Sequence, residues 1–263
     1  MMNFFRFERV IYTLSSIAIA LIFWHVVSYI LSIAYIPSPI AVAIAFIRLS
    51  VEGDVFGYTL FHHSVASLIR IAIGLFFAVI IGIPLGIIIG LSERVSYFVS
   101  PIVEVIRPIS PIAWIPFSII LFGIGLTSHA FIIWLGAFFP ILLNTYASMK
   151  GTSQTFVEVV KSMGASNLQT IRYVILPGSL PDIITGFRIG VGVGWMCLIA
   201  SEMVGQYPPL GLGFLVLFMA EIGRYPSMIA GMLTIGFFGI LLNYIILFLE
   251  KKLFKWREKI DVY

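Results

Sequence analysis

The sequence predicts an all-α polytopic membrane protein with about six transmembrane helices, and two observations support that prediction. Sixty per cent of the residues are hydrophobic and 11% are charged, whereas a soluble globule carries about a quarter charged residues. Apolar runs long enough to cross a hydrocarbon core of about 30 Å, which takes about 20 residues, recur along the chain. We expect six spans, near residues 10–33, 71–91, 109–124, 130–147, 183–204 and 228–249.

These spans divide one transmembrane domain, residues 1–263, into three parts. Residues 1–63 should form a first helix and an outer segment, 64–250 a core of five helices with a polar loop at 150–181, and 251–263 a basic tail. The first apolar run is too long for a signal peptide, so we expect an uncleaved helix. Pro108, Pro111 and Pro116 crowd the start of the third span, whose uninterrupted apolar stretch is short.

Small residues recur every four positions in the second and fifth spans. Such a stripe lets another helix backbone approach closely, so we predict tight crossings there. The positions are Gly74, Ala78, Gly82, Gly86 and Gly90 in the second span and Gly186, Gly190 and Gly194 in the fifth. The stripes are spaced for a helix face and follow no strand, so they do not indicate a phosphate-binding loop.

The positive residues predict the orientation. With the N-terminus in the cytoplasm, all of the 16 lysines and arginines except Arg48, Arg70 and Arg224 fall on the cytoplasmic side, Arg107 among them. This bias favours both termini in the cytoplasm of a multi-pass cell-membrane protein. The formal charge of +4 therefore reflects topology, and we expect no nucleic-acid partner.

The loop 150–181 is the longest internal stretch that a bilayer could not hold. Phe156, Val160 and Met163 fall on one side of a predicted helix, and Gly164 breaks the pattern before a second periodic stretch, 168–175. Leu176-Pro177 should stop that second helix. Two short helices bent at a glycine would form a projecting knob suited to a groove on a partner.

The order of residues in this loop, Glu158, Val159-Val160, Gly164-Ala165 and Val174-Ile175-Leu176-Pro177, resembles the E-A-A loop signature of ABC importer permeases. Val159-Val160 replaces the usual Ala-Ala, and Val174 replaces Ile. Residues 113–145 and 176–205 are similar to the nitrate, sulfonate, taurine and bicarbonate branch of these permeases. The resemblance implies a type I importer-like fold and an ATPase-coupling role for Phe156, Glu158, Val160, Met163, Gly164, Ala165 and Pro177.

It also implies the partners of the chain: cytoplasmic ATPase subunits, a second permease copy that forms a homodimer with this chain, and an extracytoplasmic solute-binding protein. The chain carries no G-x-x-x-x-G-K-[ST] motif, so ATP and Mg²⁺ should be bound by the ATPase subunit and not by this chain. It also lacks H-E-x-x-H and G-x-S-x-G, and the adjacent His62 and His63 diverge on a helix. We therefore expect no enzyme activity, no metal and no cofactor on this chain.

Three residues within the spans are candidates for the translocation path: Asn144, Trp195 and Glu202. Each has another interpretation, because Glu202 could pair with Arg70 or Arg224, Asn144 could bond a neighbouring helix, and Trp195 could pack in the core. A proton- or sodium-coupled transporter usually needs a carboxylate near the midplane, and the predicted spans place none there. This favours an ATP-driven importer over a nucleotide-independent secondary transporter or channel, or a scaffold that moves nothing. The resemblance alone implies that the solute is a small oxyanion such as nitrate, sulfonate, taurine or bicarbonate.

Overall fold

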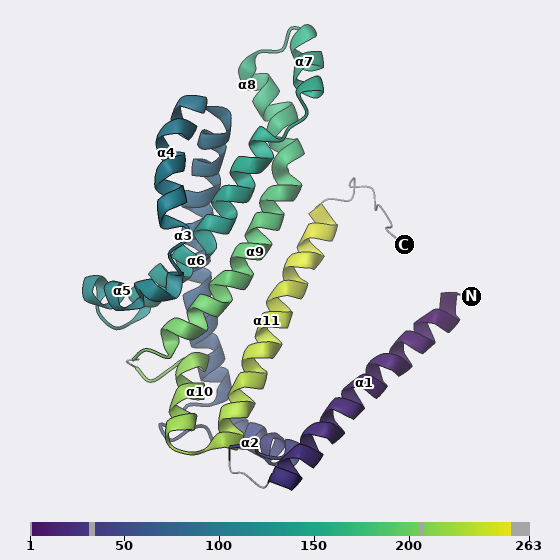
Figure 1. Cartoon of the computed structure of the whole chain (residues 1–263), viewed down its shortest axis with the longest axis vertical. Coiled ribbons are helices and arrows are strands. Elements are labelled where there is room, and N and C mark those ends of the chain that lie inside the picture. Colours follow the sequence, from purple (N-terminus) through teal and green to yellow (C-terminus); the bar gives the residue numbers. More distant parts are fainter. Residues whose placement is uncertain (1, 32–34, 206–207, 254–263) are drawn as a thin grey trace.

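The computed structural model describes residues 2–31, 35–205 and 208–253, and the described chain is built of helices. Five of them are long and apolar enough to cross a membrane, and a bent pair adds a sixth candidate. Figure 1 shows the long helices side by side, with α7 and α8 at one end and α2 and α10 at the other. We call these ends the inner and the outer end, after the orientation that the sequence predicts. In order, the elements are α1 (Met2–Leu31), α2 (Pro39–Val51), α3 (Leu60–Leu91), α4 (Glu93–Ile106), η1 (Pro111–Trp114), α5 (Ile115–Phe122), α6 (Leu126–Lys150), α7 (Gln154–Ser162), α8 (Asn167–Thr170), the π turn η2 (Ile171–Ile175), α9 (Leu176–Glu202), α10 (Leu212–Glu221) and α11 (Tyr225–Leu253).

Helix α3 packs its small-residue stripe against α6, as predicted. A Cβ atom built on Gly74 would lie 2.5 Å from Cβ of Ile133, and one on Gly86 would lie 2.7 Å from Cβ of Thr145. The same difference in residue number relates Gly82 to Ile141 and Gly90 to Met149 along the two helices. Ala78, within the stripe, is fully buried. A constant offset means that the two helices run parallel, so the chain must return across the bundle between them.

That return is made by α4, η1 and α5, which corrects the predicted third span at 109–124. Helix α4 and the η1–α5 segment are bent by 83° to each other. The break coincides with Pro108 and Pro111, which cannot continue a helix. The apolar run used for the prediction begins at Ile109, within the break, because α4 is amphipathic: Val99 and Val103 pack on the core, while the charged Arg94 and Glu104 are exposed.

Helix α6 lies between α3 and α9, and α9 runs antiparallel to it. A Cβ on Gly186 would lie 2.5 Å from Cβ of Asn144, and one on Gly190 would lie 3.0 Å from the Ala137 carbonyl oxygen. At Gly194 the nearest atoms are at ordinary contact distance, 3.4 Å. The predicted tight crossing of the fifth span is thus confirmed, and it is closest at Gly186.

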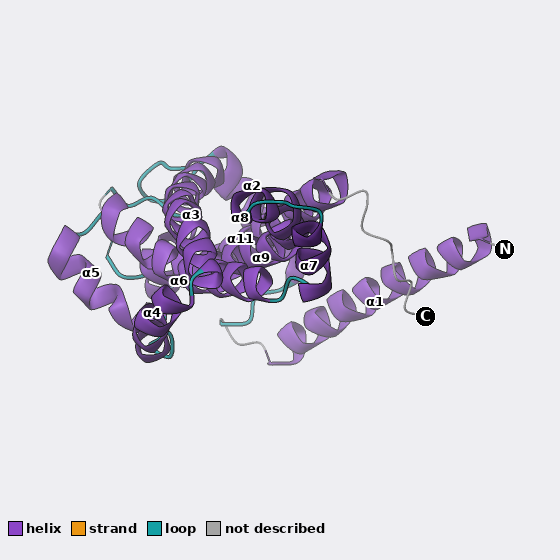
Figure 2. Cartoon of the chain, turned by 90° about the horizontal axis from the view of Figure 1, so that it is seen from above, coloured by secondary structure: helices purple, strands orange, loops and turns teal. Residues whose placement is uncertain are grey.

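The N-terminal helix stands apart from this core. In Figures 1 and 2, α1 leans away from the bundle, while α5 projects on the opposite side. The outer end carries the two short apolar helices α2 and α10. Most of the predicted basic tail, 254–263, lies outside the described residues.

Candidate functional site

The inner end of the bundle carries a projecting helix pair, α7 and α8, which we call the knob. Gly164, between the two helices, has φ +85°, a conformation that favours glycine. Ser166 caps α8 through a capping box with Gln169, which fixes the entry of the chain into this helix. The bend at Gly164 is therefore confirmed, and Figure 1 shows the knob extending beyond the ends of α4 and α11.

The knob presents apolar side chains to its surroundings. Phe156, Val159 and Met163 are exposed, Met163 to 82%, and Leu168 of α8 is exposed as well. Val160, which the sequence placed on this face, is instead half-buried. Residues 156, 159 and 163 follow helical spacing as well as 156, 160 and 163 do, so periodicity alone could not choose between the two valines.

The remaining coupling candidates lie on or beside this surface. Glu158 is exposed on α7, and Ala165 is half-buried after the bend, where its N–H donates to the Val160 carbonyl. Pro177 is exposed at the start of α9. None of these side chains is paired with another charged or polar side chain within the described residues, so the surface is available for contact.

Pro177 does not end the second helix, contrary to the prediction from the Leu176-Pro177 pair. Helices α8, η2 and α9 form one continuous helical segment of 36 residues, Asn167–Glu202. The N–H of Leu176 bonds to the Ile171 carbonyl across the π turn, so the hydrogen-bonding pattern changes just before the proline. Proline has no N–H to donate, and its ring clashes with the carbonyl of the residue four positions earlier in an α-helix. The π turn changes the backbone around that earlier residue.

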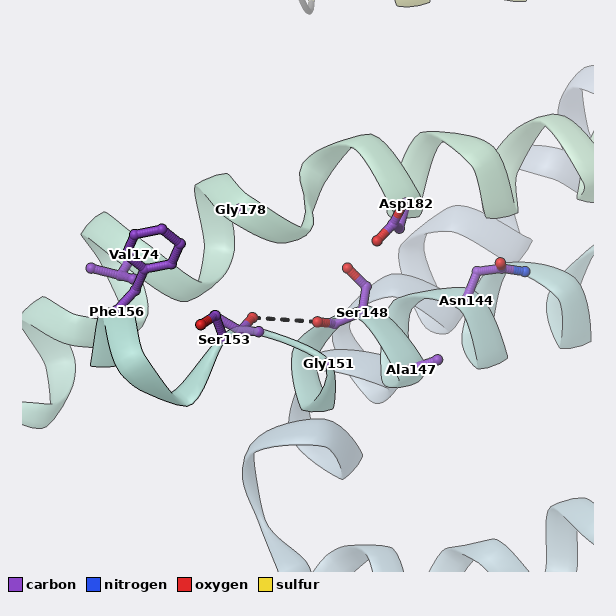
Figure 3. A pocket seen from close by; sticks show the side chains of 10 residues that line it. Asn144, Ala147, Ser148, Gly151, Ser153, Phe156, Val174, Gly178 and Asp182 are labelled. Atoms are coloured by element: carbon purple, nitrogen blue, oxygen red, sulfur yellow. Dashed lines mark hydrogen bonds between the residues drawn. The ribbon is translucent and has the colours of Figure 1, made fainter. Parts of the chain in front are cut away.

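A pocket of about 460 Å³ lies under the knob, between the last turns of α6 and the first turns of α9. Figure 3 shows Phe156 and Val174 on its knob side, with Ser148 and Asp182 facing each other across it. The Ser148 hydroxyl donates to the backbone carbonyl of residue 179 at 3.1 Å and so joins α6 to α9. The lining residues include one carboxylate and no cation, so the pocket offers no charged partner to an anion.

Asn144 lines the same pocket, but it does not bond a neighbouring helix as expected. Its amide donates to the Pro140 carbonyl in its own helix at 2.8 Å. The side-chain stem packs against Gly186 instead, so Asn144 contacts α9 by close packing.

A buried ion pair joins α3 to α9 near the outer end. Arg70 Nη1 lies 2.6 Å from Glu202 Oε1, with side-chain exposures of 8% and 0%. Ser67 donates to the carboxylate at 2.8 Å, and the N–H of Gly213 donates to the other oxygen at 2.9 Å. Of the two partners suggested by the sequence, Arg70 is therefore the one used, and Glu202 presents no surface to a solute in this conformation.

The same cluster holds the outer loops, through residues that sequence reasoning missed. The fully buried side chains of His63 and Asp54 approach to 3.3 Å, and the N–H of Gly211 donates to His63 Nδ1 at 3.1 Å. Asp54 accepts from the N–H groups of Phe56 and Tyr58. Only the spacing of His63 from Ser67 and Arg70, on one helix face, could have indicated this role.

Trp195 of α9, the third path candidate, is buried in the core between the helices. It packs with Ile71, Ile133 and Leu198, which is the alternative that the sequence left open. Within the described residues, no group of three or more His, Cys, Asp or Glu side chains is arranged to hold a metal ion.

Comparison with known proteins gives the context of these features. Residues 82–258 match the family described as binding-protein-dependent transport system inner membrane component. The chain is 36% identical over 256 residues to the taurine transport system permease protein TauC of Escherichia coli (strain K12), covering 97% of this chain and 92% of TauC. It is 32% identical to the bicarbonate transport system permease protein CmpB of Synechococcus elongatus, over 73% of this chain and 69% of CmpB. Its backbone is similar to a chain of the MetNI methionine ABC transporter, solved in inward-facing conformations, with a TM-score of 0.62, 23% identity and coverage of 76% and 96% of the two chains.

Proposed function

The chain belongs to the family of binding-protein-dependent transport system inner membrane components, the permeases of ABC importers, and from this membership we propose that it is the permease subunit of an ATP-driven importer for a small oxyanion. Such a solute would be nitrate, bicarbonate or a sulfonate such as taurine. The relatives TauC and CmpB are named for taurine and bicarbonate, and they support this class of solute. ATP and Mg²⁺ would be bound by a separate ATPase subunit.

The observation that carries the proposal is the knob. A membrane protein gains nothing by holding Phe156, Val159 and Met163 in water at the tip of a structured helix pair, unless a partner covers them. An amphipathic helix of this size fits a hydrophobic groove on another protein. We assign that groove to the ATPase, with the aromatic and methionine side chains as anchors.

The fold offers a direct route from the knob to the bundle. Because α8, η2 and α9 form one continuous helical segment, a displacement of the knob would tilt or shift α9 with it. Helix α9 packs closely on α6 at Gly186, where the Asn144 side chain lies directly against the glycine, and α6 packs on α3 in the same way at Gly86 through Thr145. Close-packed contacts of this kind transmit motion because they cannot deform gradually.

The proposal places the other partners by the two ends of the molecule. The knob and both termini would face the cytoplasm of a cell-membrane protein, and the solute-binding protein would meet the outer loops around α2 and α10. A second copy of the permease would complete the translocation path, because one chain supplies a single set of spans.

The test is co-purification of ATPase activity with the tagged chain from detergent-solubilised membranes. We compare the wild type with a Glu158→Ala, Gly164→Trp variant, and use Ile44→Ser, an exposed apolar position on α2 at the outer end, as the matched control. ATPase activity should accompany the wild type and the control and be lost with the knob variant. Absence of ATPase from the wild-type eluate would contradict the proposal and favour a nucleotide-independent transporter.

A further inference from the structure

The break between α4 and η1 places two ionisable residues inside the membrane. Glu104 and Arg107 lie in the last turn of α4 and just after it, and both line a pocket of about 140 Å³ together with Leu142 of α6. Leu142 lies eight residues before Lys150 at the inner end of α6, which is about 12 Å at 1.5 Å per residue. Along α4, Glu104 is eleven residues from Glu93, or about 17 Å.

These depths are near the middle of a hydrocarbon core of about 30 Å. The orientation count had placed Arg107 with the cytoplasmic residues, and no midplane carboxylate was expected. The structure points to a different placement of both residues, because α4 runs back from the inner end beside α3 and α6 before the chain bends away, as Figure 1 shows. An exposed Glu104 at this depth cannot reach either interface with so short a side chain.

Such groups are tolerated in a membrane when they are paired or when they face water. Glu104 and Arg107 are both exposed, and among the described residues neither has an ion-pair or hydrogen-bonded side-chain partner. Two unpaired charges exposed to lipid would be costly, so these side chains require an aqueous surrounding.

The backbone at the same depth leads independently to the same conclusion. Residues 107–110 are non-helical and exposed. Irregular backbone occurs at membrane depth only where protein buries it or where it lines a water-filled cavity, because lipid cannot satisfy its N–H and C=O groups.

A polar stripe connects this site to the inner end of α4. Ser96, Ser100, Glu104 and Arg107 fall within a sector of about 80° on a helix with 3.6 residues per turn, and the hydroxyls of Ser96 and Ser100 are 3.4 Å apart. Val95, Val99 and Val103 of α4 pack on the core. Phe98, Ile102 and Val105 occupy a separate, exposed apolar face.

From these observations we infer that the polar stripe of α4 lines the water-filled translocation path and that Arg107 contacts the anionic group of the passing solute. The inference deepens the proposed function and rests on it for the identity of the solute. Glu104, one turn away, offsets the positive charge, so that an anion is attracted but not retained. A path must bind its solute weakly enough to release it.

Cysteine labelling tests this directly, because the chain has a single cysteine, Cys197, and it is buried. In a Cys197→Ala background reconstituted in proteoliposomes, we place single cysteines at Ser100 and Arg107, and at Phe98 and Ile102 as controls on the apolar face. Water-soluble sulfonatoethyl methanethiosulfonate should label the first two and spare the controls. Labelling of all four positions, or of none, would overturn the inference.

The charge of the path is tested with the Ser100→Cys protein, by comparing labelling rates of this anionic reagent and its trimethylammonium analogue. In water-like surroundings, a charge about 6–10 Å away changes each rate about two- to threefold, in opposite directions for the two reagents. Arg107→Gln should therefore lower the anion-to-cation rate ratio about fourfold, and the nearer Glu104→Gln should raise it up to about tenfold. The control Arg94→Gln, on the same helix but outside the pocket, should leave the ratio unchanged. An unchanged ratio in Arg107→Gln would refute the anion contact.

Labelling needs neither ATP nor a known solute, so its outcome is separate from that of the ATPase co-purification. A labelled stripe without a co-purifying ATPase would leave the path in place and remove only the energy source. A co-purifying ATPase with an unlabelled stripe would retain the proposed function and refute the path.

Discussion

Replacing Glu202 by Gln should destabilise the protein strongly, although the two side chains have nearly the same shape. The change removes the negative charge from a fully buried site and leaves Arg70, with a side chain 8% exposed, without its carboxylate. Breaking a buried pair by removing one partner costs about 3–5 kcal/mol, because the other charge stays buried and unpaired. An exposed pair would cost at most about 1 kcal/mol.

The structure supplies a matched control in a second ion pair between helices. Arg188 Nη1 of α9 lies 3.4 Å from Glu250 Oε2 of α11, with side chains 36% and 20% exposed. The longer distance and the partial exposure predict a much smaller effect, so Glu250→Gln should change the free energy of unfolding by at most about 1 kcal/mol. The same chemical change is thus tested in two different environments.

The assay is thermal unfolding of the purified protein in detergent. A loss of about 3 kcal/mol corresponds to a fall in Tm of about 6–12 °C for a chain of this size. The double variant Arg70→Met, Glu202→Gln removes both charges and should be more stable than Glu202→Gln alone. The reasoning would be refuted if Glu202→Gln and Glu250→Gln had the same Tm. It would also be refuted if the double variant lost as much stability as Arg70→Met and Glu202→Gln lose together.

Three further predictions use the same unfolding assay. Gly86→Ala should lower stability by about 1–3 kcal/mol, because its Cβ would lie 2.7 Å from Thr145, whereas Gly178→Ala, with no atom within 4 Å, should be neutral or stabilising; equal effects would contradict the close α3–α6 contact. Trp195→Ala should cost about 3–5 kcal/mol through the cavity it leaves in the core, and a change below about 1 kcal/mol would show that this side chain is not packed as described. Met163→Ser should leave the Tm unchanged, since the side chain is 82% exposed, while it lowers ATPase co-purification; a large fall in Tm would mean that the knob packs against the bundle.

The helix stripes show how far the sequence alone could lead. Glycines at every fourth position predicted close packing of the second and fifth spans, and Gly74 and Gly186 each lie so close to α6 that an added Cβ would meet a side chain at 2.5 Å. The sequence did not reveal that both stripes pack on one helix. Spacing within a helix identifies a face, but the partner of that face is set by the whole bundle.

The third span shows where the reasoning failed. A hydropathy window measures the mean transfer free energy of a segment, and α4 combines a valine face with Ser96, Glu104 and other polar residues. Its mean is therefore low, although its polar stripe faces a pocket. The window consequently began at Ile109, within the bend, and left out Glu104 and Arg107.

The sequence by itself determined the properties that depend on neighbouring residues: the apolar runs, the small-residue faces and the bend of the knob at Gly164. Only the tertiary structure decided which valine of α7 is exposed, that the helix continues through Pro177, and that Glu202 pairs with Arg70, 132 residues away. The physical reason is the range of the interactions. Helix periodicity and transfer free energy act over a few residues, whereas burial, ion pairing and access to water depend on which distant segments meet when the chain folds.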